Sequence, residues 1–180
     1  MKEAIKLGIS RYMLYSLRDK GIIEQVSRGV YRLASLPAMT NPDIVTVASR
    51  FPNAVICLIS ALHFHRITTQ IPHEVFIAVN HKSRPPKIDF PPISVHKFSG
   101  TAYSEGYEIH SIDGVPVKIY CAEKTIADCF KFRNKIGMDI VLEALKMYKT
   151  RKEFNPDKLL KYAKICRITK AITPYLELLA

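Results

Sequence analysis

Cationic and aromatic side chains in the first 33 residues have the types and spacing of a nucleic-acid contact surface. If residues 11–20 are helical, Met13, Leu14 and Leu17 share one face, and the arginine and tyrosine side chains share the other. Such groups can reach bases or phosphates. The candidate DNA contacts are Ser10, Arg11, Tyr12, Tyr15, Arg18, Arg28 and Arg32.

The first element that would position these side chains is a short helix over residues 11–20. Ser10 precedes a run of good helix formers, so it is well placed to cap the first free backbone N–H groups. Gly21 can adopt the left-handed conformation that commonly ends a helix. We therefore expect a helix of about three turns with its polar side exposed.

The second element is a hairpin directly after that helix. Two β-prone runs, 22–27 and 30–33, are separated by a two-residue turn that ends in glycine. Arg28 would stand at the tip, and Arg32 would lie on the returning strand, where each could meet a phosphate. A helix, a glycine and a hairpin with a basic tip are typical of a winged helix-turn-helix.

A helix-turn-helix normally packs three helices, and only residues 1–7 precede the turn at Gly8. Residues 2–7 can supply one helix. The other is then missing from a truncated start, or a helix from elsewhere fills the gap. The alternative for the whole segment is a surface helix and hairpin whose charges are simply solvated.

The overall charge also favours a polyanionic partner. The chain has 180 residues and a formal net charge of +11. Residues 1–33 hold seven cations and three acids, and residues 150–180 hold the same numbers, so the charge concentrates at the two ends. A possible second basic surface consists of Lys158, Lys161 and Lys164.

No stretch approaches the run of about 20 apolar residues that spans a bilayer, and the N-terminus does not resemble a secretory leader. We therefore expect a cytoplasmic protein without a membrane partner. Cys57, Cys121, Cys129 and Cys166 lie in apolar runs with no C-x-x-C pair, which favours buried, reduced thiols. The histidines near residue 65 (His63, His65 and His73) are not spaced as metal ligands, so no metal or other cofactor is expected.

The chain lacks the sharper enzymatic motifs, such as a phosphate-binding loop or a nucleophile elbow. The best remaining candidate is a nuclease-like set of acids and a lysine, because metal-assisted phosphodiester cleavage needs such groups together. Glu123 and Lys124 are adjacent, however, so their side chains diverge on a helix or a strand. We expect no enzyme. The set comprises Asp113, Glu123, Lys124 and Asp128.

The remaining pattern predicts an α+β fold with a winged helix-turn-helix over 1–35, a linker over 36–42 and a mixed domain over 43–180. Four β-prone segments predict a small sheet of about four strands, the last two joined by Asp113-Gly114. Helical periodicity from residue 122 onward predicts a C-terminal helical layer, in which Asn155 caps one helix. The four segments are 74–79, 93–98, 107–112 and 115–120.

Three segments in this order resemble the AbiE-type antitoxins of bacterial type IV toxin-antitoxin and abortive-infection systems. They are 21–33 (GIIEQVSRGVYRL), 60–72 (SALHFHRITTQIP) and 121–128 (CAEKTIAD). The resemblance covers nearly the whole chain, although the N-terminus is shorter than the family pattern. It implies an N-terminal winged helix that binds repeats in the protein's own promoter, and a C-terminal domain that counteracts a nucleotidyltransferase-type toxin.

Carried over by position, the resemblance implies a recognition helix over 10–20 and a wing arginine at Arg28. The leading hypothesis is therefore a DNA-binding antitoxin that represses transcription of its own operon. One alternative is a toxin- or RNA-binding module without specific DNA binding, and another is a metal-dependent nucleic-acid enzyme. The further contacts implied by position are Arg11, Tyr12, Arg18 and Arg32.

Overall fold

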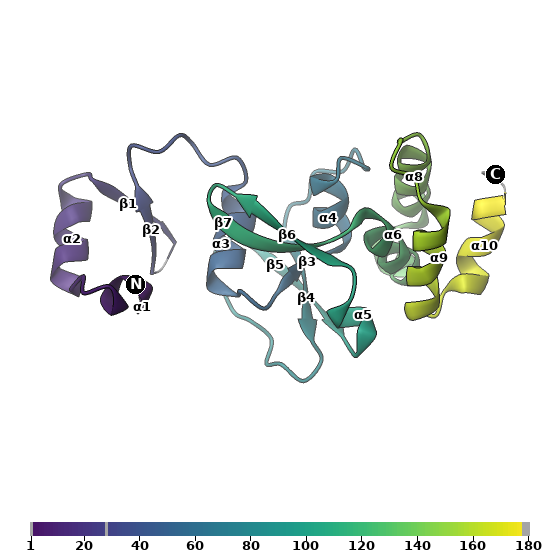
Figure 1. Ribbon diagram of the computed structural model, residues 1–180, viewed down its shortest axis with the longest axis horizontal. Coiled ribbons are helices and arrows are strands. Elements are labelled where there is room, and N and C mark those ends of the chain that lie inside the picture. The colour runs from purple at the N-terminus through teal and green to yellow at the C-terminus, as the bar shows by residue number, and fades with distance from the viewer. Residues whose placement is uncertain (1, 28, 178–180) are drawn as a thin grey trace.

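The computed structural model of the chain describes residues 2–27 and 29–177. A small helix and hairpin unit, a mixed sheet and a helical layer follow one another along the long axis of the molecule (Figure 1). The two chain ends lie in the outer parts, with the sheet between them. Among the described helices, none combines the length and apolar character that a membrane span requires.

The N-terminal unit consists of two short helices and a hairpin. Helix α1 (Lys2–Lys6) leads into α2 (Arg11–Asp19), and β1 (Ile23–Ser27) then pairs antiparallel with β2 (Val30–Leu33). The order matches the predicted one. Only these two helices precede the hairpin in the described part of residues 1–34, so a three-helix winged helix-turn-helix is not established.

The larger sheet has five strands in the spatial order β5-β4-β3-β7-β6, so the expected count of about four was wrong. The additional strand is β3 (Val55–Ile56), which pairs antiparallel with β4 and parallel with β7. It is only two residues long and lies within a continuous apolar run, where alternation gives no signal. The other strands are β4 (Val75–Asn80), β5 (Ile93–Phe98), β6 (Tyr107–Ile112) and β7 (Val115–Tyr120).

A tight turn joins β6 to β7 in the predicted register. Asp113 and Gly114 both have positive φ, 49° and 79°, as a type I′ hairpin turn requires. Ile112 pairs with Val115 directly across this turn. The Asp113 carboxylate accepts hydrogen bonds from the backbone N–H and the hydroxyl of Thr40, at 3.0 and 3.2 Å. The turn therefore also anchors the segment that leaves the N-terminal unit.

Apolar side chains cover both faces of the sheet. On one face, α3 (Pro42–Arg50) buries Val45 and Val47 against Ile56 and Ile119. On the other face, α4 (Leu58–Phe64) and α6 (Ala122–Lys131) form the first helical cover. Burial on both faces explains why the strands near the centre of the sheet read as continuous apolar runs.

The helical layer beyond α6 completes the fold. Asn155 caps α9 (Pro156–Ile165), as predicted, because its Oδ1 accepts a hydrogen bond from the Lys158 backbone N–H at 2.9 Å. Leu145 and Leu159 are fully buried against α6. The other helices are α5 (Thr101–Ser104), α7 (Arg133–Ile136), α8 (Met138–Lys149) and α10 (Thr169–Glu177).

An ion pair lies at the centre of the contact between the sheet and the helical layer. Lys124 Nζ is 2.5 Å from Asp128 Oδ2, and neither side chain has any exposed surface. The ammonium also lies 4.2 Å from the ring centroid of Tyr120 and 5.0 Å from that of Phe98. Cys166 Sγ donates to the other Asp128 oxygen at 3.1 Å. Burial raises the pKa of Asp128, and the nearby Lys124 opposes that shift.

We expect Lys124→Met to lower the free energy of unfolding by about 3–5 kcal/mol, because it leaves the buried Asp128 carboxylate without its cation. Adding Asp128→Leu to that variant should recover part of the loss, since no buried charge then remains. Urea unfolding followed by circular dichroism measures both changes. A double variant less stable than either single variant would contradict this role of the pair.

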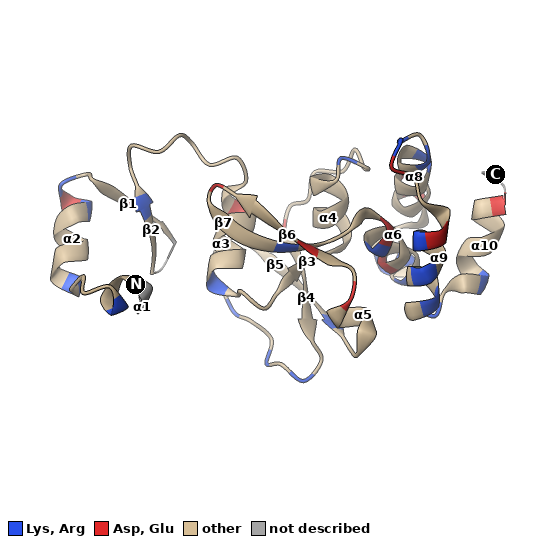
Figure 2. Ribbon diagram, viewed as in Figure 1, with Lys and Arg blue, Asp and Glu red and all other residues tan. Residues whose placement is uncertain are grey.

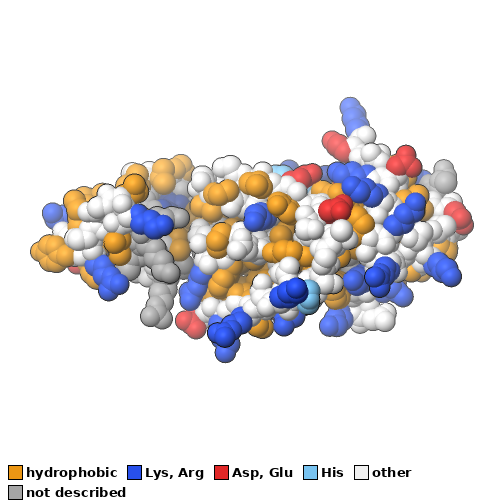
Figure 3. Space-filling model, turned by 60° about the horizontal axis from the view of Figure 1, so that its bottom comes forward, with side chains coloured by type: hydrophobic (Ala, Val, Ile, Leu, Met, Phe, Trp, Pro, Cys, Tyr) orange, Lys and Arg blue, Asp and Glu red, His pale blue; other side chains and the backbone are white. Residues whose placement is uncertain are grey.

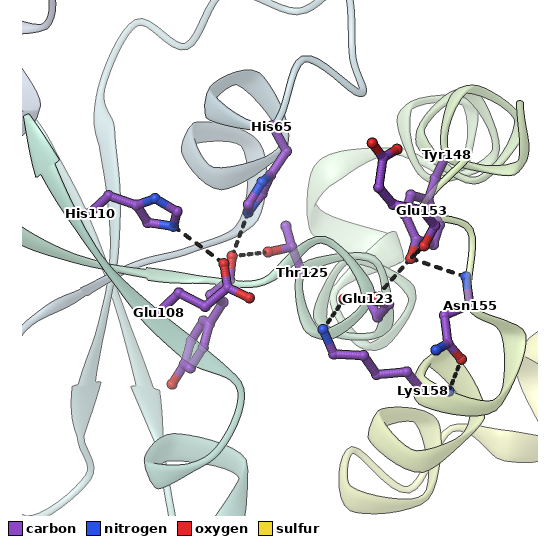
Figure 4. Close-up of polar contacts among 10 residues, drawn as sticks. His65, Glu108, His110, Glu123, Thr125, Tyr148, Glu153, Asn155 and Lys158 are labelled. Carbon is purple, nitrogen blue, oxygen red and sulfur yellow. Dashed lines mark hydrogen bonds and ion pairs between the residues drawn. The ribbon is translucent and has the colours of Figure 1, made fainter. Parts of the chain in front are cut away.

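His65 is a half-buried titratable group beside the sheet (Figure 4). Its Nε2 lies 2.7 Å from the carbonyl oxygen of Tyr120, and Thr125 Oγ1 donates to the same oxygen at 3.1 Å. Because a carbonyl only accepts hydrogen bonds, the His65 Nε2 carries the proton. Burial lowers the pKa of His65 below its usual 6.5, so the folded protein favours the neutral ring.

Stability should therefore fall as the pH drops below about 6.5, because the unfolded chain binds a proton that the folded state disfavours. His65→Gln keeps a side-chain donor and removes this titration. We expect the difference in unfolding free energy between pH about 7.5 and about 5 to shrink in that variant. Burial lowers the pKa of His96 as well, so part of the dependence should remain. An unchanged pH dependence would exclude His65 as a cause.

Candidate nucleic-acid interface

The start and end of α2 are fixed by the two residues that the sequence indicated. Ser10 Oγ accepts a hydrogen bond from the Met13 backbone N–H at 3.1 Å, which is an N-cap. At the other end, Gly21 has φ 69°, and its N–H donates to Arg18 O while the Ile22 N–H donates to Leu17 O. This pair of bonds is a Schellman motif, and it directs the chain into the hairpin.

One exposed face of α2 carries a row of three candidate contacts. Arg11, Tyr15 and Arg18 follow one another at about one helical turn, so they project on the same side. The Arg18 guanidinium lies 5.3 Å from the Tyr15 ring centroid. Tyr12, beside this row, is 84% exposed. We call these four residues the α2 face.

The opposite face of α2 is only partly covered. Leu14 is buried, as predicted, but Met13 is 51% exposed, so its expected inward position was wrong. Leu17 is half-buried, so the small N-terminal unit covers this face only in part. Met13 is therefore an exposed apolar side chain on the side of α2 away from the α2 face.

Ion pairs within the chain decide which arginines of α2 are free to contact a ligand. Arg18 Nη2 lies 2.8 Å from Asp19 Oδ1, and both side chains are largely exposed. Such a surface pair is weak and exchanges readily for another anion. The described residues give Arg11 no carboxylate partner, so its guanidinium is the less encumbered of the two.

The hairpin differs from the expected wing at Arg32. Arg32 Nε lies 2.6 Å from Glu24 Oε1 across the hairpin, and Nη2 donates to the backbone carbonyls of Leu36 and Pro37, both at 2.8 Å. Its side chain is only 14% exposed. Arg32 therefore holds the hairpin to the following segment, and Arg28 lies outside the described residues.

The proposed second basic surface on α9 is also partly neutralised (Figure 4). Lys158 Nζ lies 3.1 Å from Glu123 Oε2, and Tyr148 donates to the other Glu123 oxygen at 2.7 Å. Burial works to raise the pKa of Glu123, but these two hydrogen bonds together hold it below its usual range. Lys161 lies 3.6 Å from Glu105, and Lys164 is exposed.

The four residues of the nuclease-like set are not brought together. Lys124 and Asp128 are fully buried in the core, and Glu123 faces α8 and α9. Asp113 lies elsewhere, where it accepts a hydrogen bond from Thr40. The divergence of Glu123 from Lys124 is as predicted. Within the described ranges, no three His, Cys, Asp or Glu side chains gather as a metal site would require.

The N-terminal unit that carries the α2 face also carries the similarity to known proteins. Residues 1–34 match the AbiEi antitoxins. The family is described as a transcriptional regulator, AbiEi antitoxin, and the match supports an antitoxin and regulator role for this chain. The matched segment contains α2 and the hairpin. No curated protein matches the chain.

A cavity of about 510 Å³ lies beside α5, and the sequence did not predict it. Tyrosine and lysine side chains line it, and they come from segments that are far apart in the sequence. A run of cations over residues 81–87 was visible, but only the fold shows which aromatic side chains lie near it. No local pattern could have joined them.

We expect Arg32→Ala to loosen the β1–β2 hairpin by about 1–2 kcal/mol, because two hydrogen bonds and an ion pair are lost together. Hydrogen exchange of the amides in β1 and β2 should become faster in this variant. Arg11→Ala serves as the control, since Arg11 is exposed and should leave this exchange unchanged. Equal amide exchange rates in both variants would show that Arg32 does not stabilise the hairpin.

Proposed function

We propose that the chain is a DNA-binding antitoxin that represses transcription of its own operon. The observation that carries this proposal is the α2 face, an exposed row of arginine and tyrosine side chains in the segment that matches the AbiEi antitoxins. The net charge of +11 favours binding to duplex DNA through release of counterions.

In this proposal, α2 acts as the recognition helix in the major groove. Arg11 lies in the first turn, where recognition helices commonly meet base edges, and an arginine can bind guanine through two hydrogen bonds. Tyr12 and Tyr15 supply hydroxyl and ring contacts beside it. Arg18 would exchange Asp19 for a backbone phosphate, and Arg28 would meet the phosphates at the hairpin tip.

The antitoxin activity is assigned to residues 43–180, which have their own buried core. The proposed target is a nucleotidyltransferase-type toxin, counteracted by contact or indirectly. Because the α2 face lies at one end of the molecule and the helical layer at the other (Figure 2), repression and toxin counteraction should be separable. We place the protein in the cytoplasm, where both partners would be found.

A gel-shift titration with the DNA upstream of the operon tests the proposal. Arg11→Ala combined with Arg18→Ala should weaken binding at least tenfold, and each lost phosphate contact should reduce the salt slope by about one unit. Lys152→Ala combined with Lys170→Ala, which also removes two exposed cations but far from α2, is the control for net charge.

The fold of each variant is checked by circular dichroism. Rescue from a co-expressed toxin of this class should survive in the double variant, because residues 43–180 are unchanged. Unaltered DNA affinity of the double variant would refute the assignment of the α2 face.

A further inference from the structure

The cavity beside α5 opens on the face of the sheet opposite α3. Its floor includes Lys118, which lies between Val117 and Ile119 on β7. Those two neighbours pack with α3, so alternation along the strand directs Lys118 to the other face. The helical layer covers this face elsewhere, but here the sheet stays open to solvent. The cavity measures about 510 Å³, which suits one small ligand.

The lining combines cations, aromatic rings and uncharged amides. Lys82 and Lys118 supply positive charge, and the Lys118 ammonium lies 5.6 Å from the ring centroid of Tyr107. Tyr103 supplies a second ring. Asn53 and Asn80 can each donate and accept hydrogen bonds, and none of the lining residues is acidic. These side chains suit an anion that also carries a flat, polar ring system.

Hydrogen bonds hold the walls of the cavity in place. The Tyr103 hydroxyl donates to the backbone carbonyl of Asn53, which joins α5 to the start of β3. The buried Tyr120 hydroxyl in turn donates to the Tyr103 carbonyl at 2.8 Å. Asn80 Oδ1 accepts from the Lys82 backbone N–H at 3.0 Å, which fixes the beginning of the loop after β4. The site is therefore largely formed before a ligand binds.

The loop after β4 extends the positive charge beyond the cavity. Residues 81–87 include His81, Lys82, Arg84 and Lys87 and no acid. In the described part of the chain, no ion pair joins Lys82, Arg84, Lys87 or Lys118 to a carboxylate. Figure 3 shows this side of the molecule, where basic side chains project beside the loop. An anionic ligand would find charge both at the floor and at the rim.

We propose that this cavity binds a single nucleotide unit, with its base stacked on Tyr107 and its phosphate held by Lys118 and Lys82. Base-on-aromatic stacking beside a positive groove is how many proteins hold unpaired nucleotides. Asn53 and Asn80 face the edge of the base. The nucleotide is either free or part of a single strand, and both present the same chemistry. This site does not depend on the α2 face, so either proposal can hold without the other.

Fluorescence anisotropy of the full chain with a labelled single-stranded RNA pentanucleotide tests the proposal at low salt. Tyr107→Ala should weaken binding about tenfold, because one stacking contact is lost. Tyr107→Phe keeps the ring and should bind within about twofold of the unchanged protein. Lys118→Gln should weaken binding and reduce the salt slope by about 0.7 units, the value for one phosphate of a single strand.

Lys152→Gln is the matched control, because it removes an exposed cation at the far end of the molecule without touching the cavity. The thermal unfolding midpoint verifies the fold of every variant. Competition with nucleoside 5′-monophosphates identifies the source of the ligand. Displacement by a monophosphate indicates a free nucleotide, and displacement by unlabelled strand alone indicates a nucleic acid.

Four results would overturn the proposal. The pentanucleotide and the monophosphates could both fail to bind, or Tyr107→Ala could bind the strand as well as the unchanged protein does. Inorganic phosphate or a poly-aspartate peptide could compete as well as the nucleotides, which would exclude recognition of the base. Displacement of the strand by operator duplex DNA would place its binding at the α2 face instead.

Discussion

The buried contact between Lys124 and Asp128 is the interaction on which the C-terminal region depends. Both charges come from one helix, α6, and they are enclosed by Tyr120 and Phe98 from the sheet and by Cys166 from the end of α9. Because both partners lie on α6, the pair by itself does not fix how the helix meets the sheet; the contacts of the Lys124 ammonium with the Tyr120 and Phe98 rings make that connection. The ring contacts of Lys124 and the Cys166 hydrogen bond to Asp128 therefore tie α6 to the sheet and to the end of α9.

The same contact determines how β6 begins. Gly106 has φ 83°, and a Cβ atom there would lie 2.9 Å from Lys124 Cγ, closer than side chains normally approach. Glycine is needed both for the backbone conformation and for the close approach. The Gly106 carbonyl also accepts the Cys121 N–H at 2.7 Å, which brings the ends of β6 and β7 together. Tyr107, the next residue, is thereby fixed at the edge of the cavity beside α5.

The N-terminal unit, unlike the C-terminal region, has almost no buried core. Among its described side chains, Leu14 is buried, whereas Leu7, Tyr12, Met13 and Leu33 are each at least half exposed. A unit with so small a core gains little free energy from burial. Hydrogen bonds at its helix caps therefore contribute a larger share of its stability. It keeps its polar and apolar side chains available to a partner, which is the property that a recognition element needs.

The sequence predicted those features that depend on neighbouring residues. The cap at Ser10, the helix end at Gly21, the turn at Asp113 and the cap at Asn155 each require a particular side chain at a particular backbone conformation, and all four are present. The bounds and the pairing of the two-residue strand β3 could not be found in this way. Its existence depends on partners more than 20 residues distant in sequence.

Arg32 shows a second reason why the candidate site could be predicted only in part. Its position on the returning strand was correct, but a sequence does not say whether an arginine meets its own chain or a ligand. Here Glu24 and two carbonyls lie within reach, so the guanidinium already has partners in its own chain. The α2 face, in contrast, needs only helical periodicity, and that part of the prediction agrees with the exposure of its side chains.

Counting charge over long segments also hid a basic stretch in the central region of the chain. Residues 34–149 carry thirteen cations and ten acids, which suggested that polyanion binding belongs to the two ends. The fold removes several of these charges from consideration, because Lys124 and Asp128 neutralise each other in the core and Glu123 is occupied by Lys158. The acid-free run over 81–87 then lies beside Lys118 and two tyrosines. The distribution of charge after pairing, rather than the net charge of a long segment, decides where a polyanion can bind, and by that measure residues 81–87 form a basic segment in the central region.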